Sequence, residues 1–451
     1  MPITPAPPAR PDEIAGRRRR RPGHAPQGAR PLGPHGRRVN QVIGGAIFLM
    51  PAQLAAVIGN WAPIGFVLAG IASLLVALCF AEVGSRFERT GGPYLYTRAA
   101  FGPFIAFEVG WMQWFTRATS QASIVNGIAL ALGFYWPAMA AGPGRAALIT
   151  ATILGLAWIN VRGIRQSAWV VNVLTIGKLA PLGIFILIGL AFADWSRLAP
   201  LPPVTLPQAA SAGLLLIFTF GGFDVVSVPA GESTHPRRDI PFAFITTIAV
   251  VTIVMTLAHL VAMTTLGDLA GSTTPLADSA ATFMGPAGAA LIGIGSVISM
   301  TGNNAGQVLT GSRMLFALGE NRALPVFFRY VHPVYRTPTH AIWFTSIVAL
   351  ALALSGSFAF LAIVSAVARL ITYLGTSAAT LALRSPRFAD TVRPATFVIP
   401  FGPWVPILAV VVSVAILAGS SGAELVGGAA ALAVGAVLFA VNAALERSGQ
   451  A

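Results

Sequence analysis

Residues 42–51 read VIGGAIFLMP and residues 218–229 read FTFGGFDVVSVP, so two distant apolar segments share one interruption, paired glycines followed by a proline. Glycine inside a helix costs up to about 1 kcal/mol relative to alanine, and proline removes a backbone hydrogen bond. A helix that breaks inside a membrane leaves backbone N–H and C=O groups free to bind a ligand, so paired breaks point to a binding site. The alternative is that the glycines only let neighbouring helices pack closely.

The chain around these breaks is far more apolar than a soluble domain. Its 451 residues are 55% hydrophobic and 10% charged, with a mean hydropathy of +0.75. A helix needs about 20 apolar residues to cross the hydrocarbon core, whereas β-barrel strands are short and alternating. The sequence therefore predicts an all-α integral membrane protein with twelve transmembrane helices. The expected spans are 40–59, 62–83, 103–136, 145–162, 168–193, 209–231, 241–266, 283–318, 340–357, 360–384, 398–419 and 423–444.

Breaks in the first and sixth spans predict two halves of five helices each. Because five is odd, the second half would cross the membrane in the opposite orientation. The sequence thus predicts inverted repeats over about 39–193 and 209–384, followed by two further helices over about 398–444. They form one membrane domain over 39–446, behind a basic tail over 1–38 that is expected to be disordered.

The positive charges predict how the chain sits in its membrane. Its net charge is +14, but Lys and Arg gather in the tail and in alternate connections, and only Arg145 and Arg197 fall in connections on the other side. Cytoplasmic loops carry the excess of Lys and Arg. We therefore expect both termini in the cytoplasm and a multi-pass protein of the plasma membrane, in contact with lipid and not with nucleic acid. The sequence gives no indication of oligomeric state.

The residues that hold cofactors elsewhere are scarce in this sequence. Cys79 is the sole cysteine, which leaves no disulfide or Cys-based metal site. The chain has no phosphate-binding P-loop, which argues against direct ATP drive. We expect no cofactor and no metal.

Three motifs resemble a known family. Residues 43–52 (IGGAIFLMPA), the loop at 80–102 (FAEVGSRFERTGGPYLYTRAAFG) and residues 221–241 (GGFDVVSVPAGESTHPRRDIP) resemble, in order and spacing, signatures of the amino acid, polyamine and organocation (APC) superfamily. The resemblance implies a LeuT-type fold with helices 1 and 6 broken, and a permease that is not an enzyme. The sequence departs from the family pattern at Ala46, where glycine is usual, and at Asp224, where many relatives have glutamate. The apolar half-helix before the first break is also short.

The two breaks predict a site for a zwitterionic amino acid. Exposed N–H groups at the start of an outer half-helix suit a carboxylate, and we expect Gly45 and Ala46 to bind it. Free carbonyls at the ends of inner half-helices suit the ammonium group, and we assign Val42, Phe218 and Gly221 to it. Because only backbone is used, this part would accept any α-amino acid. The expected substrate-binding residues of the breaks are Val42, Gly44, Gly45, Ala46, Phe218, Gly221 and Gly222.

Side-chain selectivity needs further groups, and Arg117 is the unusual candidate. A charge at mid-span costs about 2.5 to 3.5 kcal/mol on insertion scales and normally faces a partner or a cavity. Arg117 either pairs with Asp224 or Glu108, or contacts the substrate directly, which would favour an acidic or polar substrate. The candidates for selectivity are Arg117, Gln121, Phe218, Asp224 and Gln307.

Lys178 is the only lysine in the chain, and it lies inside the fifth span. A buried lysine can release its proton, whereas an arginine stays charged. Proton-coupled members of the resembled family place a lysine at this span. The resemblance therefore implies that Lys178 carries the proton, near residues 42–44 of the first span and Ser299, Thr301 or Asn303 of the eighth. The alternative is a lysine that snorkels to the interface. Asp224 is the second candidate for proton coupling.

These features predict a secondary active transporter that moves an amino acid across the plasma membrane, coupled to protons. One alternative is an exchanger of amino acids or amines, which would need no proton carrier such as Lys178. Another is a substrate sensor, which should have a folded cytoplasmic output domain. The longest loops, over 319–339 and 385–397, are too short to form one.

Overall fold

The computed structural model of the chain describes residues 44–87, 91–163, 168–224 and 236–447. Within these ranges, the side chains of residues 168–176, 178, 236–241, 243 and 446–447 are not described. The expected tail over 1–38, the half-helix before the first break and Val42 therefore lie outside the described residues.

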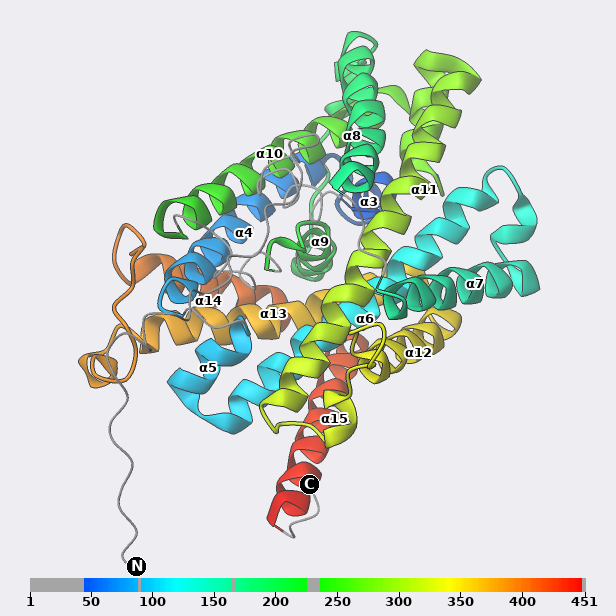
Figure 1. Cartoon of the computed structure of the whole chain (residues 1–451). Helices are drawn as coiled ribbons and strands as arrows, with labels where there is room; N and C mark the ends of the chain where they lie inside the picture. Colours follow the sequence, from blue (N-terminus) through cyan, green and yellow to red (C-terminus); the bar gives the residue numbers. More distant parts are fainter. Residues whose placement is uncertain (1–43, 88–90, 164–167, 225–235, 448–451) are drawn as a thin grey trace, which may run out of the picture. The chain divides into compact units, whose positions relative to one another are not determined.

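Every regular element in these ranges is a helix (Figure 1). The α-helices are α3 (Ala46–Ile58), α4 (Ala62–Gly84), α5 (Pro93–Phe101), α6 (Pro103–Gly133), α7 (Gly142–Val161), α8 (Ala168–Ala191), α9 (Leu206–Thr219), α10 (Pro236–Thr265), α11 (Pro275–Glu320), α12 (Thr339–Ser355), α13 (Phe358–Ala382), α14 (Trp404–Ala418) and α15 (Gly422–Arg447). Single 3-10 turns are η1 (Gly59–Trp61), η2 (Pro137–Met139), η3 (Trp195–Leu198), η6 (Val326–Arg329) and η7 (Pro386–Phe388). The prediction of an all-α protein is confirmed for the described part of the chain.

A helix lies on each expected span, although some ends differ. Among the described residues, six stretches are long and apolar enough to cross a membrane, and four further apolar helices are shorter. The six are Ala46–Gly84, Gly142–Val161, Phe244–Thr265, Pro275–Glu320, Phe358–Ala382 and Gly422–Leu445. The chain is thus a multi-pass membrane protein, while the number twelve stays a prediction.

In the sixth span, the helix ends just before the paired glycines. α9 ends at Thr219, and Gly222 has a φ of 119°, a conformation that side-chain-bearing residues rarely adopt. In the first span, Gly44 and Gly45 form a bend and α3 begins directly after them. The end of the helix at Thr219 is confirmed, whereas residues 225–231 of the expected sixth span lie outside the described residues, so a second half-helix there stays a prediction. For the first span, the start of the outer half-helix is confirmed, and an inner half-helix stays a prediction.

Two features were not expected from the sequence. The loop between the second and third spans contains α5, which starts at Pro93 after Gly92, and Pro is favoured at the first position of a helix. α11 begins at Pro275 rather than near 283 and bends at Gly285, which has a φ of 67° and is followed by Pro286. Both helices begin with proline, a local signal that apolar periodicity does not capture.

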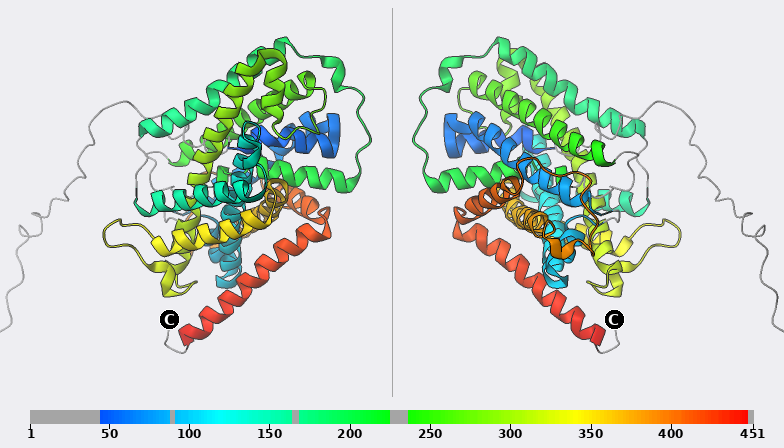
Figure 2. Two further views of the ribbon diagram at one scale, coloured as in Figure 1. Left: turned by 90° about the vertical axis from the view of Figure 1, so that its right-hand side faces the viewer. Right: turned by 90° about the vertical axis from the view of Figure 1, so that its left-hand side faces the viewer.

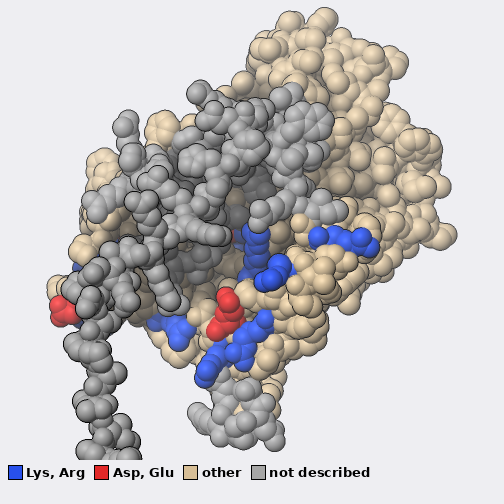
Figure 3. Space-filling view, in the orientation of Figure 1, with Lys and Arg blue, Asp and Glu red and all other residues tan. Residues whose placement is uncertain are grey.

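α6 is the helix around which the bundle is built. It packs against α11 and α13 on its two sides, and α3 packs against α9. Beyond this centre, α4 packs against α10 and α8 against α11, while α15, red in Figure 2, lies along the outside against α6 and α13. Charged side chains gather in the lower half of the face shown in Figure 3, and the upper right of that face is uncharged. Because α13 packs against both α6 and α9, the end of α9 lies close to the centre of the bundle (Figure 1).

Candidate functional site

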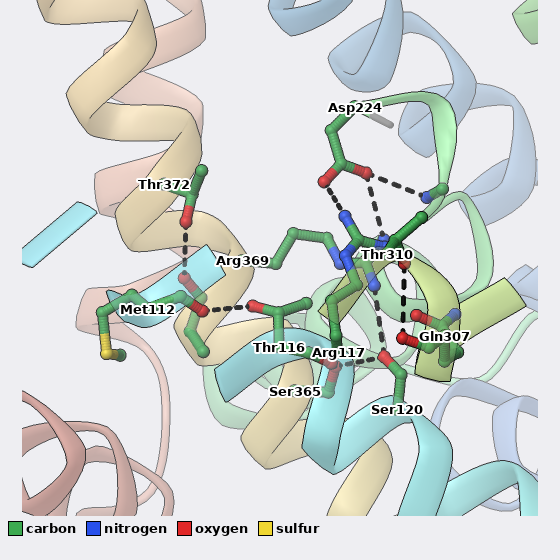
Figure 4. A network of polar contacts seen from close by, with 12 residues as sticks. Met112, Thr116, Arg117, Ser120, Asp224, Gln307, Thr310, Ser365, Arg369 and Thr372 are labelled. Carbon is green, nitrogen blue, oxygen red and sulfur yellow. Dashed lines mark hydrogen bonds and ion pairs between the residues drawn. The ribbon is translucent and has the colours of Figure 1, made fainter. Parts of the chain in front are cut away.

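Three buried charged side chains meet beside the break in the sixth span (Figure 4). Arg117 of α6 donates from Nη2 to Oδ2 of Asp224, which lies just after the break. Arg369 of α13 places Nη1 3.9 Å from Oδ1 of the same carboxylate. The exposed fraction of each of these side chains is 3% or less. We call Arg117, Asp224 and Arg369 the central charge cluster.

Hydroxyl groups connect the central charge cluster to α6 and α13. Nη2 of Arg369 donates to Oγ of Ser120 at 3.4 Å, and the Oγ atoms of Ser120 and Ser365 are 2.7 Å apart. Ser365 also donates to the carbonyl oxygen of Thr116 at 3.2 Å. Figure 4 shows this chain of contacts running between the two helices. Arg369 therefore links the segment after α9 to both α6 and α13.

Glycines make the space in which the two arginines lie. A Cβ atom added to Gly221 would overlap the guanidinium of Arg369, so this side chain rests directly on the broken segment. A Cβ atom added to Gly311 of α11 would lie 3.2 Å from Cβ of Arg117. Gly222 donates its backbone N–H to Oδ1 of Asp224 at 3.2 Å. The broken backbone and the charged side chains thus form one site.

The arginines have more hydrogen-bond donors than the described residues have acceptors for. Nε and Nη1 of Arg117 and Nε and Nη1 of Arg369 are buried without a hydrogen-bond partner in the described part of the chain. Both polar atoms of the Gln121 amide and Oε1 of Gln307 are also buried without a hydrogen-bond partner among the described residues. Buried polar groups are normally paired, because leaving them unpaired costs their full desolvation energy. This surplus of donors makes the cluster a candidate for binding an anionic group.

The first break lies against α11. A Cβ atom on Gly44 would stand 2.5 Å from Nδ2 of Asn303, and one on Gly45 would overlap Cγ of Met300. Ser299 donates from Oγ to the carbonyl oxygen of Gly44 at 3.3 Å. Among the described residues, no side chain caps the N-terminus of α3, so none of them occupies the N–H groups expected to bind a carboxylate.

The remaining expected residues are spread around these two breaks. Gln307 donates to Oδ1 of Asn303 at 3.1 Å on α11, and Gln121 is fully buried on α6. Phe218 is buried in α9, where its carbonyl oxygen accepts the N–H of Gly221 at 3.0 Å, so this carbonyl is less available to an ammonium group than expected. The side chain of Lys178 lies outside the described residues, and only its place in α8 is known.

The structure decides between the two partners expected for Arg117. The pair with Asp224 is confirmed. The alternative pair with Glu108 is wrong: Glu108 faces α15, where a Cβ atom on Gly435 would lie 2.8 Å from its Oε2. Glu108 stands more than two helical turns before Arg117 on α6, too far for a pair on one helix face.

Sequence reasoning missed the role of Arg369. Arg369 lies within the expected span 360–384, but we assigned it no function from the sequence. The signal was present, because a charge at mid-span is a candidate for function wherever it occurs. What the sequence does not contain is the packing of α13 against α6 that brings Arg369 to Asp224.

Glu82 was also missed, and it holds a second polar cluster at the end of α4. Its fully buried carboxylate accepts hydrogen bonds from Nε of Arg384 at 2.7 Å and from the backbone N–H of Ile399 at 2.9 Å. Nη2 of Arg86, one helical turn further along, lies 3.8 Å from Oε1 of Glu82. The hydrogen bonds to Glu82 raise the pKa of Arg384 above its usual value. This cluster joins α4 to the end of α13 and to the segment before α14.

The chain is similar to known transport proteins. Residues 38–441 match the family model for amino acid permeases. The chain is 29% identical to the methylthioribose transporter of Bacillus subtilis, over 81% of this chain and 82% of that protein. It is 30% identical to the serine/threonine exchanger SteT of the same species, over 82% of this chain and 86% of that protein. The branched-chain amino acid permease BcaP, also from Bacillus subtilis, is 29% identical over 68% of this chain and 70% of that protein.

Proposed function

Because this chain belongs to the amino acid permease family, we propose that it is a secondary active transporter that moves an amino acid across the plasma membrane, driven by protons. The named relatives carry different cargoes, namely methylthioribose, serine and threonine, and branched-chain amino acids. The relatives therefore support transport but do not indicate which substrate this chain takes. The substrate must be sought in the side chains of the site.

The geometry of the two breaks is the observation that carries this proposal. α3 starts at Ala46 with an N-terminus that no described side chain caps, and α9 ends at Thr219 before a glycine with positive φ. α3 and α9 pack against each other. A zwitterion needs both N–H donors for its carboxylate and carbonyl acceptors for its ammonium group. In our proposal Gly45 and Ala46 bind the carboxylate, and the carbonyls of Val42 and Gly221 bind the ammonium. The Phe218 carbonyl, which already accepts the N–H of Gly221, contributes its second lone pair.

Helix packing supports the proposed inverted repeats over 39–193 and 209–384. If α3, α4, α6, α7 and α8 correspond to α9, α10, α11, α12 and α13, each contact in one half should have a counterpart in the other. The contact of α6 with α13 corresponds to that of α11 with α8, and the contact of α6 with α12 corresponds to that of α11 with α7. Some helices also pack directly against their own counterpart in the other half, as α4 packs against α10. Such symmetry is expected where two repeats alternate around a central site.

Proton coupling is assigned to Lys178 on the basis of its place in α8. The carbonyl oxygen of Gly177, the preceding residue, lies 3.6 Å from where a Cβ atom of Gly295 in α11 would stand. Gly295 is one helical turn before Ser299, which contacts Gly44 of the first break. The backbone at Lys178 is thus within about a side chain's reach of the first break, where a change of charge could alter access.

Uptake into proteoliposomes with and without an imposed pH gradient tests the proposal. Lys178→Ala removes the titratable group and Lys178→Arg fixes the charge, so both variants should lose pH-driven accumulation by at least about tenfold. Arg197→Lys, in an exposed connection, is the matched control and should behave as the unmodified protein. If the Arg variant still followed the pH gradient at a near-normal rate, Lys178 would not be the carrier and Asp224 would be the next candidate.

Obligate exchange is the second candidate, favoured by the likeness to an exchanger. An exchanger accumulates label only when the vesicles contain a counter-substrate. Uptake into empty vesicles that rises with an inward proton gradient would support symport. Uptake that requires internal amino acid and ignores the gradient would support exchange.

A further inference from the structure

The central charge cluster contains two positive charges and one negative charge. Among the described residues, Asp224 is the only carboxylate that pairs with Arg117 or Arg369. Each arginine side chain contributes one positive charge. A buried charge without a counter-charge is strongly unfavourable. Counted over the described residues, the cluster therefore lacks one negative charge.

Arg369 is the arginine whose charge is less compensated. Arg117 donates directly to Asp224, whereas Nη1 of Arg369 remains 3.9 Å from that carboxylate. The hydrogen bond from Nη2 of Arg369 to Ser120 is long, at 3.4 Å, and its acceptor is neutral. Nε and Nη1 of Arg369 have no hydrogen-bond partner within the described ranges. A guanidinium with free N–H groups is suited to accept a carboxylate through two parallel hydrogen bonds.

Arg369, whose charge is the less compensated of the two, lies next to the place where the carboxylate and ammonium groups of a substrate are proposed to bind. The guanidinium of Arg369 rests on Gly221, one of the residues assigned to the substrate ammonium group. Gly222 links the same segment to Asp224. A substrate held at the breaks would therefore lie beside Arg369, within reach of its guanidinium.

We propose that the central charge cluster selects amino acids with an acidic side chain, and that Arg369 binds the side-chain carboxylate. This inference rests on the proposed amino acid transport. Arg117 is a positioning residue in this arrangement, because it neutralises Asp224 and leaves Arg369 for the substrate. Acidic substrates compensate the cluster, neutral ones leave it positive, and cationic ones add a like charge. The expected order of preference is acidic, then neutral, then cationic.

A free inorganic anion such as chloride could supply the same compensation. The two sources differ in one respect, since an acidic substrate brings its own charge and needs no added anion. A neutral substrate bound together with chloride would instead require chloride for transport. The experiment therefore compares vesicles in chloride with vesicles in gluconate.

Proteoliposomes containing the full chain should take up labelled L-glutamate or L-aspartate. At equal concentration, an unlabelled acidic amino acid should inhibit this uptake at least tenfold better than serine or leucine, and arginine should inhibit least. Replacement of chloride by gluconate should have little effect. Arg369→Gln leaves one arginine for one aspartate, so we expect it to lower the ratio of acidic to neutral uptake at least tenfold. The matched control, Arg197→Gln, lies in an exposed connection and should keep the ratio of the unmodified protein.

The outcomes separate this inference from the proposed function. Uptake of neutral amino acids with no uptake or inhibition by acidic ones would overturn the inference and leave amino acid transport intact. Chloride-dependent uptake of neutral amino acids would overturn it in favour of a free anion. Absence of any amino acid uptake would remove the proposed function and the inference with it. If Arg369→Gln does not fold, Arg369→Lys keeps the charge without the fork, and an unchanged acidic-to-neutral ratio in that folded variant would contradict binding through two parallel hydrogen bonds.

Discussion

Gly221 is the residue at which the broken backbone and the charged side chains meet. Gly221→Ala would place a methyl group where the Arg369 guanidinium lies, because a Cβ atom there overlaps that group. We expect the variant to displace Arg369, to lose at least about tenfold in substrate affinity, and to melt at a lower temperature. Ligand binding and thermal unfolding in detergent measure both effects.

Gly155 of α7 provides the matched control for this substitution. It has open space where a Cβ atom would stand, and alanine is the better helix former, so Gly155→Ala should bind and melt as the unmodified protein does or slightly better. Equal behaviour of Gly221→Ala and Gly155→Ala would show that Arg369 does not depend on this glycine.

The residues of the site differ in how far the sequence could predict them. A charge inside a span needs a partner, and few carboxylates lie in the spans. The pairing of Arg117 with Asp224 could therefore be predicted from the sequence. The contribution of Arg369 was not, since it depends on which helix faces which. The sequence also did not predict that the N–H of Gly221 would occupy the carbonyl of Phe218.

At the scale of elements, Glu82 joins three segments that are far apart in the chain. Its carboxylate contacts Arg384 after α13 and the backbone of Ile399 before α14. Glu82→Gln keeps the shape but removes the charge, and an amide cannot accept both hydrogen bonds from the guanidinium. Hydrogen bonds to charged groups contribute about 1.5 to 3 kcal/mol, so we expect the free energy of unfolding to fall by about 2 kcal/mol. Denaturation in detergent micelles measures this loss.

The exposed pair of Asp194 and Arg197 is the comparison for Glu82. The exposed fractions of these side chains are 51% and 41%, and water screens such a pair. Hydrogen bonds from Ser196 and Arg197 lower the pKa of Asp194, so its small contribution should be present at neutral pH and lost as the pH falls through that lowered pKa. Asp194→Asn should therefore change stability little. If Asp194→Asn lowered the free energy of unfolding as much as Glu82→Gln does, burial would not be what determines how much an ion pair contributes to stability.

Elements with a strong local signal were predictable, and elements fixed by packing were not. The glycine pairs predicted the end of α9 near Thr219 and the start of α3, because glycine and proline act on their own backbone. α5 was missed because it is short and only partly apolar. Its order comes from Tyr94 and Tyr96, which are buried against other helices, and a linear pattern does not show such contacts.

For the whole molecule, length and hydropathy alone identify fewer spans than the chain has helices. α6 is not among the six apolar stretches, although it lies at the centre of the bundle. Its many polar side chains, Arg117 and Gln121 among them, are buried against α11 and α13 rather than exposed to lipid. A helix enclosed by other helices does not need an apolar surface, so hydropathy underestimates the spans that carry the site.

Inverted repeats make a prediction about the whole molecule that two cysteines can test. The connection after α6 and the connection after α11 occupy corresponding places in the two proposed halves, so they must lie on opposite sides of the membrane. Trp136 in the first connection is 60% exposed and Val334 in the second is 76% exposed, whereas Cys79, the sole cysteine, is buried. Trp136→Cys and Val334→Cys therefore each add one accessible thiol to a background that should not react.

In intact cells, a membrane-impermeant maleimide should label Trp136→Cys, because the positive charges predict that this connection lies outside. Val334→Cys should be labelled only after the membrane is permeabilised, and the unmodified protein in neither condition. The reverse pattern would keep the inversion but place the termini outside, against the distribution of Lys and Arg. Labelling of both cysteines from the same side would contradict the inverted repeats themselves. Alternating access around the two breaks would then lose its structural basis, because that mechanism needs halves of opposite orientation.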